Sequence, residues 1–436
     1  METPVLVPAD VAFMLVATAL VLLMTPALAF FYGGLVRSKN SLNAMMMSFT
    51  ALGFVGVAWA LVGYSLAFSA GSPFVGGLSR AFLNGVGLEA QGTIPHLLFM
   101  AYQGTFAIIT AALISGAIVE RMRFLPYVVF ITLWSLAVYG PVAHWVWGGG
   151  FLARLGALDF AGGTVVHVNA ATAALVAALV IGQRKDYARQ AILPHNVPFV
   201  LLGAGLLWFG WFGFNAGSAL AANAVASLAF VNTMLAPAAT LVVWTLVDLT
   251  RGGKATAVGA ATAIVVGLVA ITPGAGFVSP TGALGIGALA ALPSYFALVA
   301  RARTGLDDSL DVVAAHGLGG TVGALLTGVF ASRAWNGTVD GLVHGNPGQL
   351  GIQAIGVAAA IAWSGIASFL LLKLIGLAMP LKVATKDEGL GLDVSQHGEE
   401  AYADDDGAIL ILQTTGAGEA GAGALAGLPA AEGGRS

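Results

Sequence analysis

Long apolar stretches, each followed by a short polar or charged segment, repeat along most of the chain. A helix that crosses the hydrocarbon core of a membrane needs about 20 mostly apolar residues. Eleven stretches approach or exceed this length, at residues 10–34, 43–68, 95–119, 124–142, 164–182, 197–217, 226–249, 255–273, 279–300, 309–330 and 351–379. The pattern therefore predicts an all-α polytopic membrane protein with eleven transmembrane helices.

Basic residues divide the connecting segments into two alternating sets. One set contains Arg37, Lys39, Arg121, Arg123, Arg184, Lys185, Arg189, Arg251, Lys254, Arg301 and Arg303. The other set contains only Arg80, Arg154 and Arg333. Because short loops rich in lysine and arginine stay in the cytoplasm, we expect the N-terminus outside and the C-terminus inside. An odd number of spans gives the same orientation.

The character of the chain changes after the last apolar stretch. Residues 380–406 are polar and acidic, and residues 413–434 form a Gly/Ala tract with too few large apolar groups to build a core. We therefore expect a transmembrane domain over residues 1–380 and a cytoplasmic tail over residues 381–436. The tail is expected to be mobile after about residue 407.

Composition narrows the function classes. Of 436 residues, 58% are hydrophobic and 9% are charged, whereas soluble domains carry roughly a quarter charged residues. The net charge of −3 gives no reason to expect a nucleic-acid partner, and the absence of cysteine excludes disulfides and thiolate chemistry. The sixty glycines suit close helix packing in lipid, where small residues let backbones approach.

Two segments from opposite halves of the chain share one pattern. DFAGGTVVHVNAAT and DSLDVVAAHGLGGT each have a histidine eight residues after an aspartate and a threonine five residues after that histidine. The aspartates are Asp159 and Asp308, and the histidines are His167 and His316. The two patterns lie five spans apart, so the copies begin on opposite sides of the membrane. The pattern predicts an inverted five-plus-five repeat, and such folds place the substrate path at the repeat interface.

The two histidines are the main candidates for chemistry. An ionisable side chain inside a span is costly and is by default a functional-site hypothesis. His167 and His316 could share a proton and relay it, or each could be a structural histidine bonded to a backbone carbonyl. A metal site is the third interpretation, but two histidines without carboxylate or thiolate partners supply few ligands for a metal ion. We therefore expect no metal and no cofactor.

Aromatic side chains gather near the predicted outer ends of the spans. They are Tyr102, Phe106, Trp145, Trp147, Trp211 and Phe214, with Ser218 close behind in sequence. An interfacial aromatic belt is the simple explanation, but glycine neighbours favour packing inside the bundle. Aromatic faces there can attract a small cation or form a hydrophobic gate. Asp159 could attract cations from outside, or cap the helix that follows it.

An ordered series of segments at these residues resembles the ammonium transporter family, and most of all its bacterial branch. The segments are FYGGLVRSKN at 31–40, YQGTFA at 102–107, VERMRF at 119–124, HWVWGGG at 144–150, DFAGGTVVHVNA at 159–170, GWFGFNAGS at 210–218, ITPGAGFV at 271–278, HGLGGTVG at 316–323 and HGEEAY at 397–402. The resemblance covers about residues 10–402. The Gly/Ala extension beyond it departs from the family pattern.

The resemblance implies a role for each matching residue. Trp147, Ser218 and Phe106 would recruit ammonium at the outer face, supported by the carboxylate of Asp159. Phe106 and Phe214 would form a stacked gate below that site. His167 and His316 would be the twin histidines of a hydrophobic pore. Trp211 and Thr272 would line or brace the path, and Tyr102 stands where the family often has phenylalanine, so its role stays open.

The resulting hypothesis is an ammonium transporter of the cell (inner) membrane that conducts ammonia after removing a proton, with the proton co-transported. The resemblance further implies a homotrimer and a PII-type signalling protein at the cytoplasmic tail, with membrane lipid around the bundle. An ammonium sensor and an Rh-like neutral gas channel are the alternatives. We do not expect the protein to be an enzyme, because the chain offers only the histidine pair and no nucleophile paired with a base.

Overall fold

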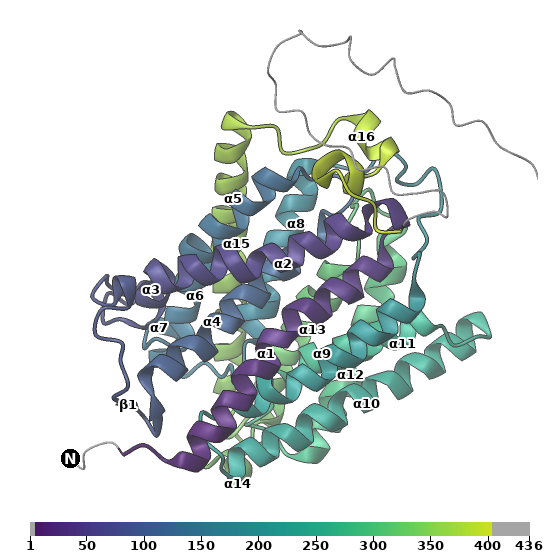
Figure 1. Ribbon diagram of the computed structural model, residues 1–436. Coiled ribbons are helices and arrows are strands. Elements are labelled where there is room, and N and C mark those ends of the chain that lie inside the picture. Colours follow the sequence, from purple (N-terminus) through teal and green to yellow (C-terminus); the bar gives the residue numbers. More distant parts are fainter. Residues whose placement is uncertain (1–4, 403–436) are drawn as a thin grey trace, which may run out of the picture.

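The computed structural model describes residues 5–402, which form one bundle of long helices (Figure 1). The helices of the first half, long and short, are α1 (Pro8–Leu35), α2 (Ser41–Ala58), α3 (Tyr64–Phe68), α4 (His96–Leu113), α5 (Phe124–Trp134), α6 (Gly140–Val146), α7 (Phe151–Leu155) and α8 (Asn169–Ile181). A small hairpin pairs β1 (Ala90–Gln91) with β2 (Ile94–Pro95). The expected mobility after residue 407 lies outside the described residues.

The second half supplies the other helices. They are α9 (Val197–Gly217), α10 (Ala224–Gly252), α11 (Ala257–Ile271), α12 (Pro280–Arg301), α13 (Gly319–Phe330), α14 (Arg333–Asn336), α15 (Gly348–Ala378) and α16 (Thr385–Leu390). Within residues 5–402, ten helical segments are long and apolar enough to cross a membrane, and α11 is a shorter apolar helix. Each lies at a position predicted from the apolar pattern, because long apolar runs need internally hydrogen-bonded backbone in lipid.

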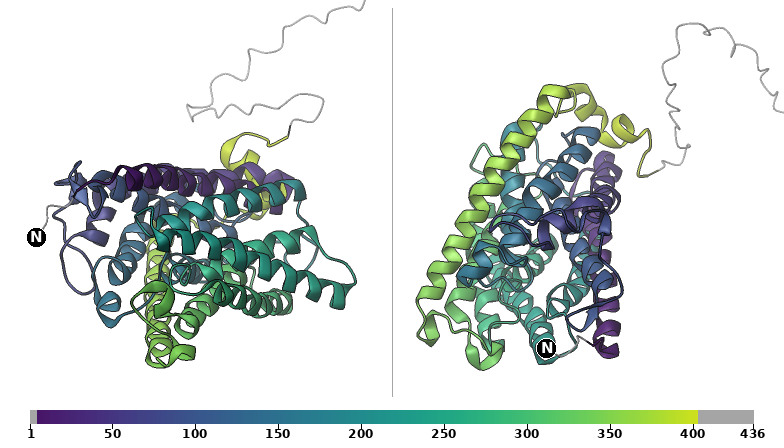
Figure 2. Two further views of the ribbon diagram at one scale, coloured as in Figure 1. Left: turned by 90° about the horizontal axis from the view of Figure 1, so that it is seen from below. Right: turned by 90° about the vertical axis from the view of Figure 1, so that its left-hand side faces the viewer.

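Small residues let the helices approach closely. A Cβ at Gly203 of α9 would come within 2.4 Å of the backbone nitrogen of Phe31 in α1. A Cβ at Gly287 of α12 would come within 2.0 Å of the carbonyl oxygen of Ala236 in α10. No larger side chain fits at either crossing, which explains part of the glycine content. Figure 2 shows α15 and α1 on opposite sides of this bundle.

The two copies of the repeated pattern adopt the same local structure. In each copy a π-helical turn contains the histidine and continues into an α-helix: η6 (Gly163–Val168) leads into α8, and η7 (Val313–Leu318) leads into α13. Asp159 accepts hydrogen bonds from backbone amides of η6, and Asp308 accepts them from Val312 and Val313. The two π-helical turns contact each other in the bundle.

A buried ionic network ties the helix ends together at the end of the bundle where α1 finishes. Glu120 accepts hydrogen bonds from Arg37, Arg184 and Asn40, and Arg184 also pairs with Asp307 at 2.7 Å. Burial alone would raise the pKa of the Glu120 carboxyl, but the guanidinium groups beside it hold that pKa below its usual value. The network thus joins the end of α1 to the segments that contain Glu120, Arg184 and Asp307.

The first part of the tail packs against the same end of the bundle. Asp393 accepts hydrogen bonds from the backbone amides of Leu42 and Asn43, which begin α2. Lys39 donates to the carbonyl oxygens of Glu388 and Gly389. These contacts hold this part of the tail at the same end of the bundle as the polar network, and Figure 1 shows α16 at that end.

Candidate functional site

Three cavities follow one another through the bundle. Two stacked phenylalanine rings separate the first from the second, and the second and third share lining residues. The first, which we call the aromatic vestibule, has a volume of about 320 Å³. Its wall consists of Phe68, Phe99, Gln103, Phe106, Val146, Trp147, Phe160, Ser218 and Leu220. Most of these side chains are apolar or aromatic, and Gln103 and Ser218 supply the polar side chains.

Hydrogen bonds hold Trp147 and Ser218 in the vestibule wall. The indole Nε1 of Trp147 donates to the backbone carbonyl of Asp159 at 2.8 Å, so the ring face stays free. The Ser218 hydroxyl donates to the carbonyl of Phe214 at 2.8 Å. Its oxygen lone pairs can therefore accept from a ligand. The rings of Phe106 and Trp147 lie edge to face, with centroids 6.0 Å apart.

Two stacked phenylalanines close the floor of the vestibule. The ring centroids of Phe106 and Phe214 lie 4.2 Å apart with an interplanar angle of 28°. Tyr102 lies behind them, and its hydroxyl contacts the carbonyl oxygens of Gly213 and Phe214 and the Ser218 hydroxyl. Tyr102 is thus next to the gate and anchors the end of α9, but it is not part of the vestibule wall.

Below the stacked rings lies a narrow apolar cavity of about 10 Å³. Its lining is Met24, Leu28, Phe31, Ile109, Leu113, Val166, His167, Leu207, Trp211, Phe214, Val265 and His316. A cavity of this volume holds roughly one water-sized molecule. A hydrated ion does not fit.

The two histidines meet at the bottom of this narrow cavity. Their Nδ1 atoms lie 3.2 Å apart, so one ring must donate its proton to the other. His167 also stacks on Trp211, with centroids 5.3 Å apart, and its Nε2 has no hydrogen-bond partner among the described residues. Trp211 is fixed in turn by a 2.8 Å hydrogen bond from its indole to the Thr272 hydroxyl.

The third cavity opens beyond the histidines toward the end of the bundle that carries the tail. Its volume is about 430 Å³, and it shares Phe31, Val265 and His316 with the narrow cavity. Polar residues, among them Arg301 and Asp311, line its wider part. The path therefore runs from an aromatic vestibule, through a narrow apolar segment, into a wider cavity with both polar and apolar lining.

Asp159 acts in the structure as a helix cap. Its two carboxylate oxygens accept hydrogen bonds from the amides of Gly162, Gly163, Thr164 and Val165, at distances from 2.6 to 3.0 Å. The carboxylate does not line the vestibule. It reaches that cavity only through its backbone carbonyl, which binds Trp147.

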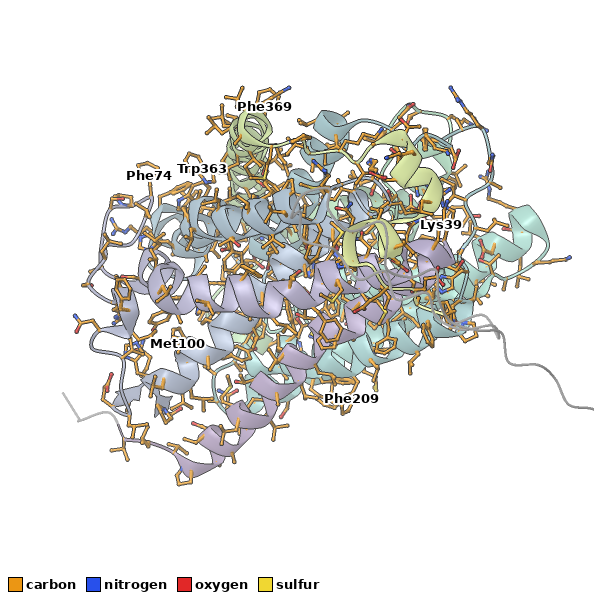
Figure 3. All side chains as sticks on the ribbon, turned by 45° about the horizontal axis from the view of Figure 1, so that its top comes forward. Lys39, Phe74, Met100, Phe209, Trp363 and Phe369 are labelled. Atoms are coloured by element: carbon orange, nitrogen blue, oxygen red, sulfur yellow. The ribbon has the colours of Figure 1, made fainter. Side chains whose placement is uncertain are left out.

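Sequence reasoning predicted Phe106 but missed Phe99 and Gln103 of the same vestibule wall. The three residues are spaced by four and three positions, so helical periodicity could have put all of them on one face of α4. Phe68 and Phe160 carry no such signal, because only the tertiary fold brings them to the vestibule. Trp145, by contrast, donates to the Phe74 carbonyl and lines an apolar crevice with Phe74 and Trp363 instead of the vestibule. Figure 3 labels Phe74 and Trp363 at this crevice.

Within residues 5–402 no group of three or more histidine or carboxylate side chains is placed to hold a metal ion. The described lining of the path combines aromatic and aliphatic side chains with the Ser218 hydroxyl, the Gln103 amide and the two paired imidazoles.

Comparisons with known proteins agree with this geometry. The sequence profile of the Ammonium Transporter Family matches residues 12–402. An ammonium transporter of Bacillus subtilis is 46% identical over 400 residues, covering 91% of this chain and 98% of the relative. One from Aquifex aeolicus is 50% identical over 401 residues, covering 90% and 93%. The crystal structure of Saccharomyces cerevisiae Mep2 matches with a TM-score of 0.82 and 36% identity, covering 87% and 88%. A solved sensor Amt protein matches with a TM-score of 0.83 and 30% identity, covering 89% and 98%.

Proposed function

The chain belongs to the ammonium transporter family, and we propose that it binds ammonium in the aromatic vestibule, removes a proton and conducts ammonia past the two histidines. The observation that carries this proposal is the change of character along the path. A vestibule suited to a small cation ends at stacked rings, beyond which about 10 Å³ of apolar space remains.

The vestibule offers the cation two kinds of contact. The faces of Trp147 and Phe106 attract positive charge by about 0.5–2 kcal/mol, with the larger value for desolvated sites. The Ser218 oxygen accepts one N–H of ammonium, since its own proton is already donated to the Phe214 carbonyl. Asp159 supports this site indirectly, because its carbonyl orients the Trp147 ring.

Selection against potassium follows from the cost of burying charge. Moving a bare cation into an apolar cavity costs many kcal/mol, tens in the idealised limit. Ammonium can lower that cost by leaving its proton behind, and potassium cannot. We therefore place the deprotonation step at the gate formed by Phe106 and Phe214. Ammonia, which is close to water in size, then enters the narrow cavity alone.

The histidine pair gives the proton a separate route. When His167 carries its proton on Nδ1 and donates it to the Nδ1 lone pair of His316, the Nε2 of His167 is unprotonated. That Nε2 can then take a proton while the Nδ1 proton moves to His316. We propose that the proton passes along this pair, so that transport carries net charge. The alternative is that the rings only keep the cavity narrow and neutral.

Orientation, assembly and partners are part of the same proposal. Because basic loops stay in the cytoplasm, we place the vestibule at the outer face of the membrane and the tail in the cytoplasm. The membrane is the cell membrane, which is the inner membrane in a bacterium that has two. A homotrimer with one path per subunit, and a PII-type protein at the tail, follow from the family. A neutral gas channel gains no support from the vestibule, since cation-binding rings would bring it no advantage.

Two measurements test the proposal. Expression in a strain that lacks ammonium uptake should restore growth on low ammonium, whereas a pure sensor would not. Purified protein in proteoliposomes should give a current on a jump in ammonium but not on an equal jump in potassium. A Trp147→Leu variant should raise the half-saturating ammonium concentration several-fold. Unchanged half-saturation in that variant would contradict the recruitment site.

A further inference from the structure

A second chain of titratable side chains lies behind the vestibule, and the proposed path does not use it. The Nδ1 atom of His96 lies 2.8 Å from a carboxylate oxygen of Glu89, and its Nε2 atom lies 2.6 Å from the Tyr64 hydroxyl. His96 and Tyr64 are buried, whereas Glu89 is exposed. We call these three residues the rim chain.

The hairpin of β1 and β2 builds this geometry. Its strands pair Ala90 with Pro95, and the His96 amide donates to the Glu89 carbonyl at 2.9 Å. Glu89 therefore stands directly against the first residue of α4. Its own backbone N–H and the hydrogen bond from His96 hold the pKa of the Glu89 carboxyl below its usual value. The negative charge consequently faces the imidazole.

Tyr64 connects the rim chain to the vestibule wall. Its ring lies 5.5 Å from that of Phe68 and 6.4 Å from that of Phe99, between centroids. Phe68 and Phe99 pack edge to face at 5.1 Å, and both line the vestibule. The Tyr64 hydroxyl thus fixes the ring that supports two of the vestibule's rim residues. Figure 3 labels Met100, the residue after Phe99 on α4.

The hydrogen bonds fix one form of the His96 ring. The carboxylate can only accept, so Nδ1 carries a proton, and in the neutral ring Nε2 accepts from the Tyr64 hydroxyl. Arg80 also lies beside Tyr64: its guanidinium lies 5.9 Å from the centre of the Tyr64 ring and donates to the Phe68 carbonyl.

We propose that Glu89, His96 and Tyr64 are positioning residues for ammonium recruitment, which hold Phe68 and Phe99 at the vestibule rim. This inference rests on the proposed function. The groups that face the His96 ring are Glu89 from the hairpin and Tyr64 from α3, with Arg80 over Tyr64. The rim chain touches neither the gate nor the paired histidines of the path.

The test compares ammonium currents in proteoliposomes for three variants. Tyr64→Phe removes the hydroxyl but keeps the ring. His96→Gln keeps one donor and one acceptor but cannot take up a second proton. His344→Gln, on the exposed turn η8 (Leu342–His344), is the matched control. Melting curves of each purified protein separate rim effects from misfolding.

We expect Tyr64→Phe to raise the half-saturating ammonium concentration about threefold to tenfold, as for one lost buried hydrogen bond, with the maximal current within about twofold. His96→Gln keeps an acceptor for the Tyr64 hydroxyl and should raise half-saturation less than Tyr64→Phe, and His344→Gln should match the parent.

The outcomes separate the two proposals. A parent protein without any ammonium current contradicts the proposed function itself. If the parent carries a normal ammonium current and Tyr64→Phe leaves the half-saturating concentration unchanged, the rim proposal alone is contradicted. The rim proposal is also overturned if His344→Gln raises half-saturation as far as Tyr64→Phe does.

Discussion

Replacing Asp159 by asparagine should destabilise the protein without removing a ligand from ammonium. The two carboxylate oxygens accept four amide hydrogen bonds, two on Oδ1 and two on Oδ2. In asparagine one oxygen becomes an NH₂ group, which cannot accept from an N–H. Two of the four bonds are therefore lost, and two buried donors remain without partners.

The magnitude follows from that count. A hydrogen bond to a charged group contributes about 1.5–3 kcal/mol, so losing two costs about 3 kcal/mol or more. Asp308→Asn is the internal comparison, because Oδ1 binds Val312 and Oδ2 binds Val313, and only one bond is lost. The same rule gives about 1.5 kcal/mol there. Asp159→Asn should thus lower the melting midpoint about twice as far as Asp308→Asn.

Current measurements complete this test. Because the cap positions the turn that contains His167, Asp159→Asn should lower the maximal current and leave half-saturation within about twofold, since the cap makes no contact with the bound cation. A variant with the parent's melting midpoint and a half-saturating concentration raised tenfold would refute this reasoning. It would mean that the Asp159 carboxylate contacts ammonium directly.

Three further predictions concern the gate, the ionic network and the tail. Replacing Phe106 and Phe214 together by alanine should admit potassium current, because the apolar barrier widens and water can enter. Glu120→Gln should cost about 3 kcal/mol in unfolding experiments, because the buried Arg184 loses one of its two carboxylate partners and keeps only Asp307. Burial raises the pKa of Asp393 to about 6, so its contribution to tail docking is present below the unfolded value near 4 and is lost as pH rises through about 6. Protease cleavage of the tail should therefore be faster at pH about 7.5 than at pH about 5.5. This ratio of cleavage rates should be larger in the parent than in Asp393→Asn, which has no carboxyl group to titrate.

The positions of the helices could be predicted from the sequence because lipid imposes a strict rule. Backbone polar groups must bond within the segment, so every long apolar run becomes a helix. The pairing of His167 with His316 was also predictable, since the aspartate-to-histidine spacing is the same in both copies. The 3.2 Å contact between their Nδ1 atoms is the structural result of that repeat.

Other features depend on tertiary contacts that leave no local pattern. The π-helical turns around both histidines read as ordinary apolar helix in the sequence. Phe68 and Phe160 reach the vestibule from segments whose own composition gives no reason to expect it. A carboxylate that precedes a helix can either cap that helix or attract cations, so the sequence could not assign Asp159 to one role. The four amide contacts of its carboxylate show that it caps the helix.

The central claim is that a cation is recruited but only ammonia and a relayed proton cross the narrow cavity. The most direct test is the current in proteoliposomes on matched jumps of ammonium and potassium, for the parent and for a variant with both His167 and His316 replaced by alanine. The account predicts current with ammonium alone in the parent, and loss of proton-coupled current or of selectivity in the variant. An ammonium current that persists unchanged without both histidines, or a potassium current in the parent, would contradict it.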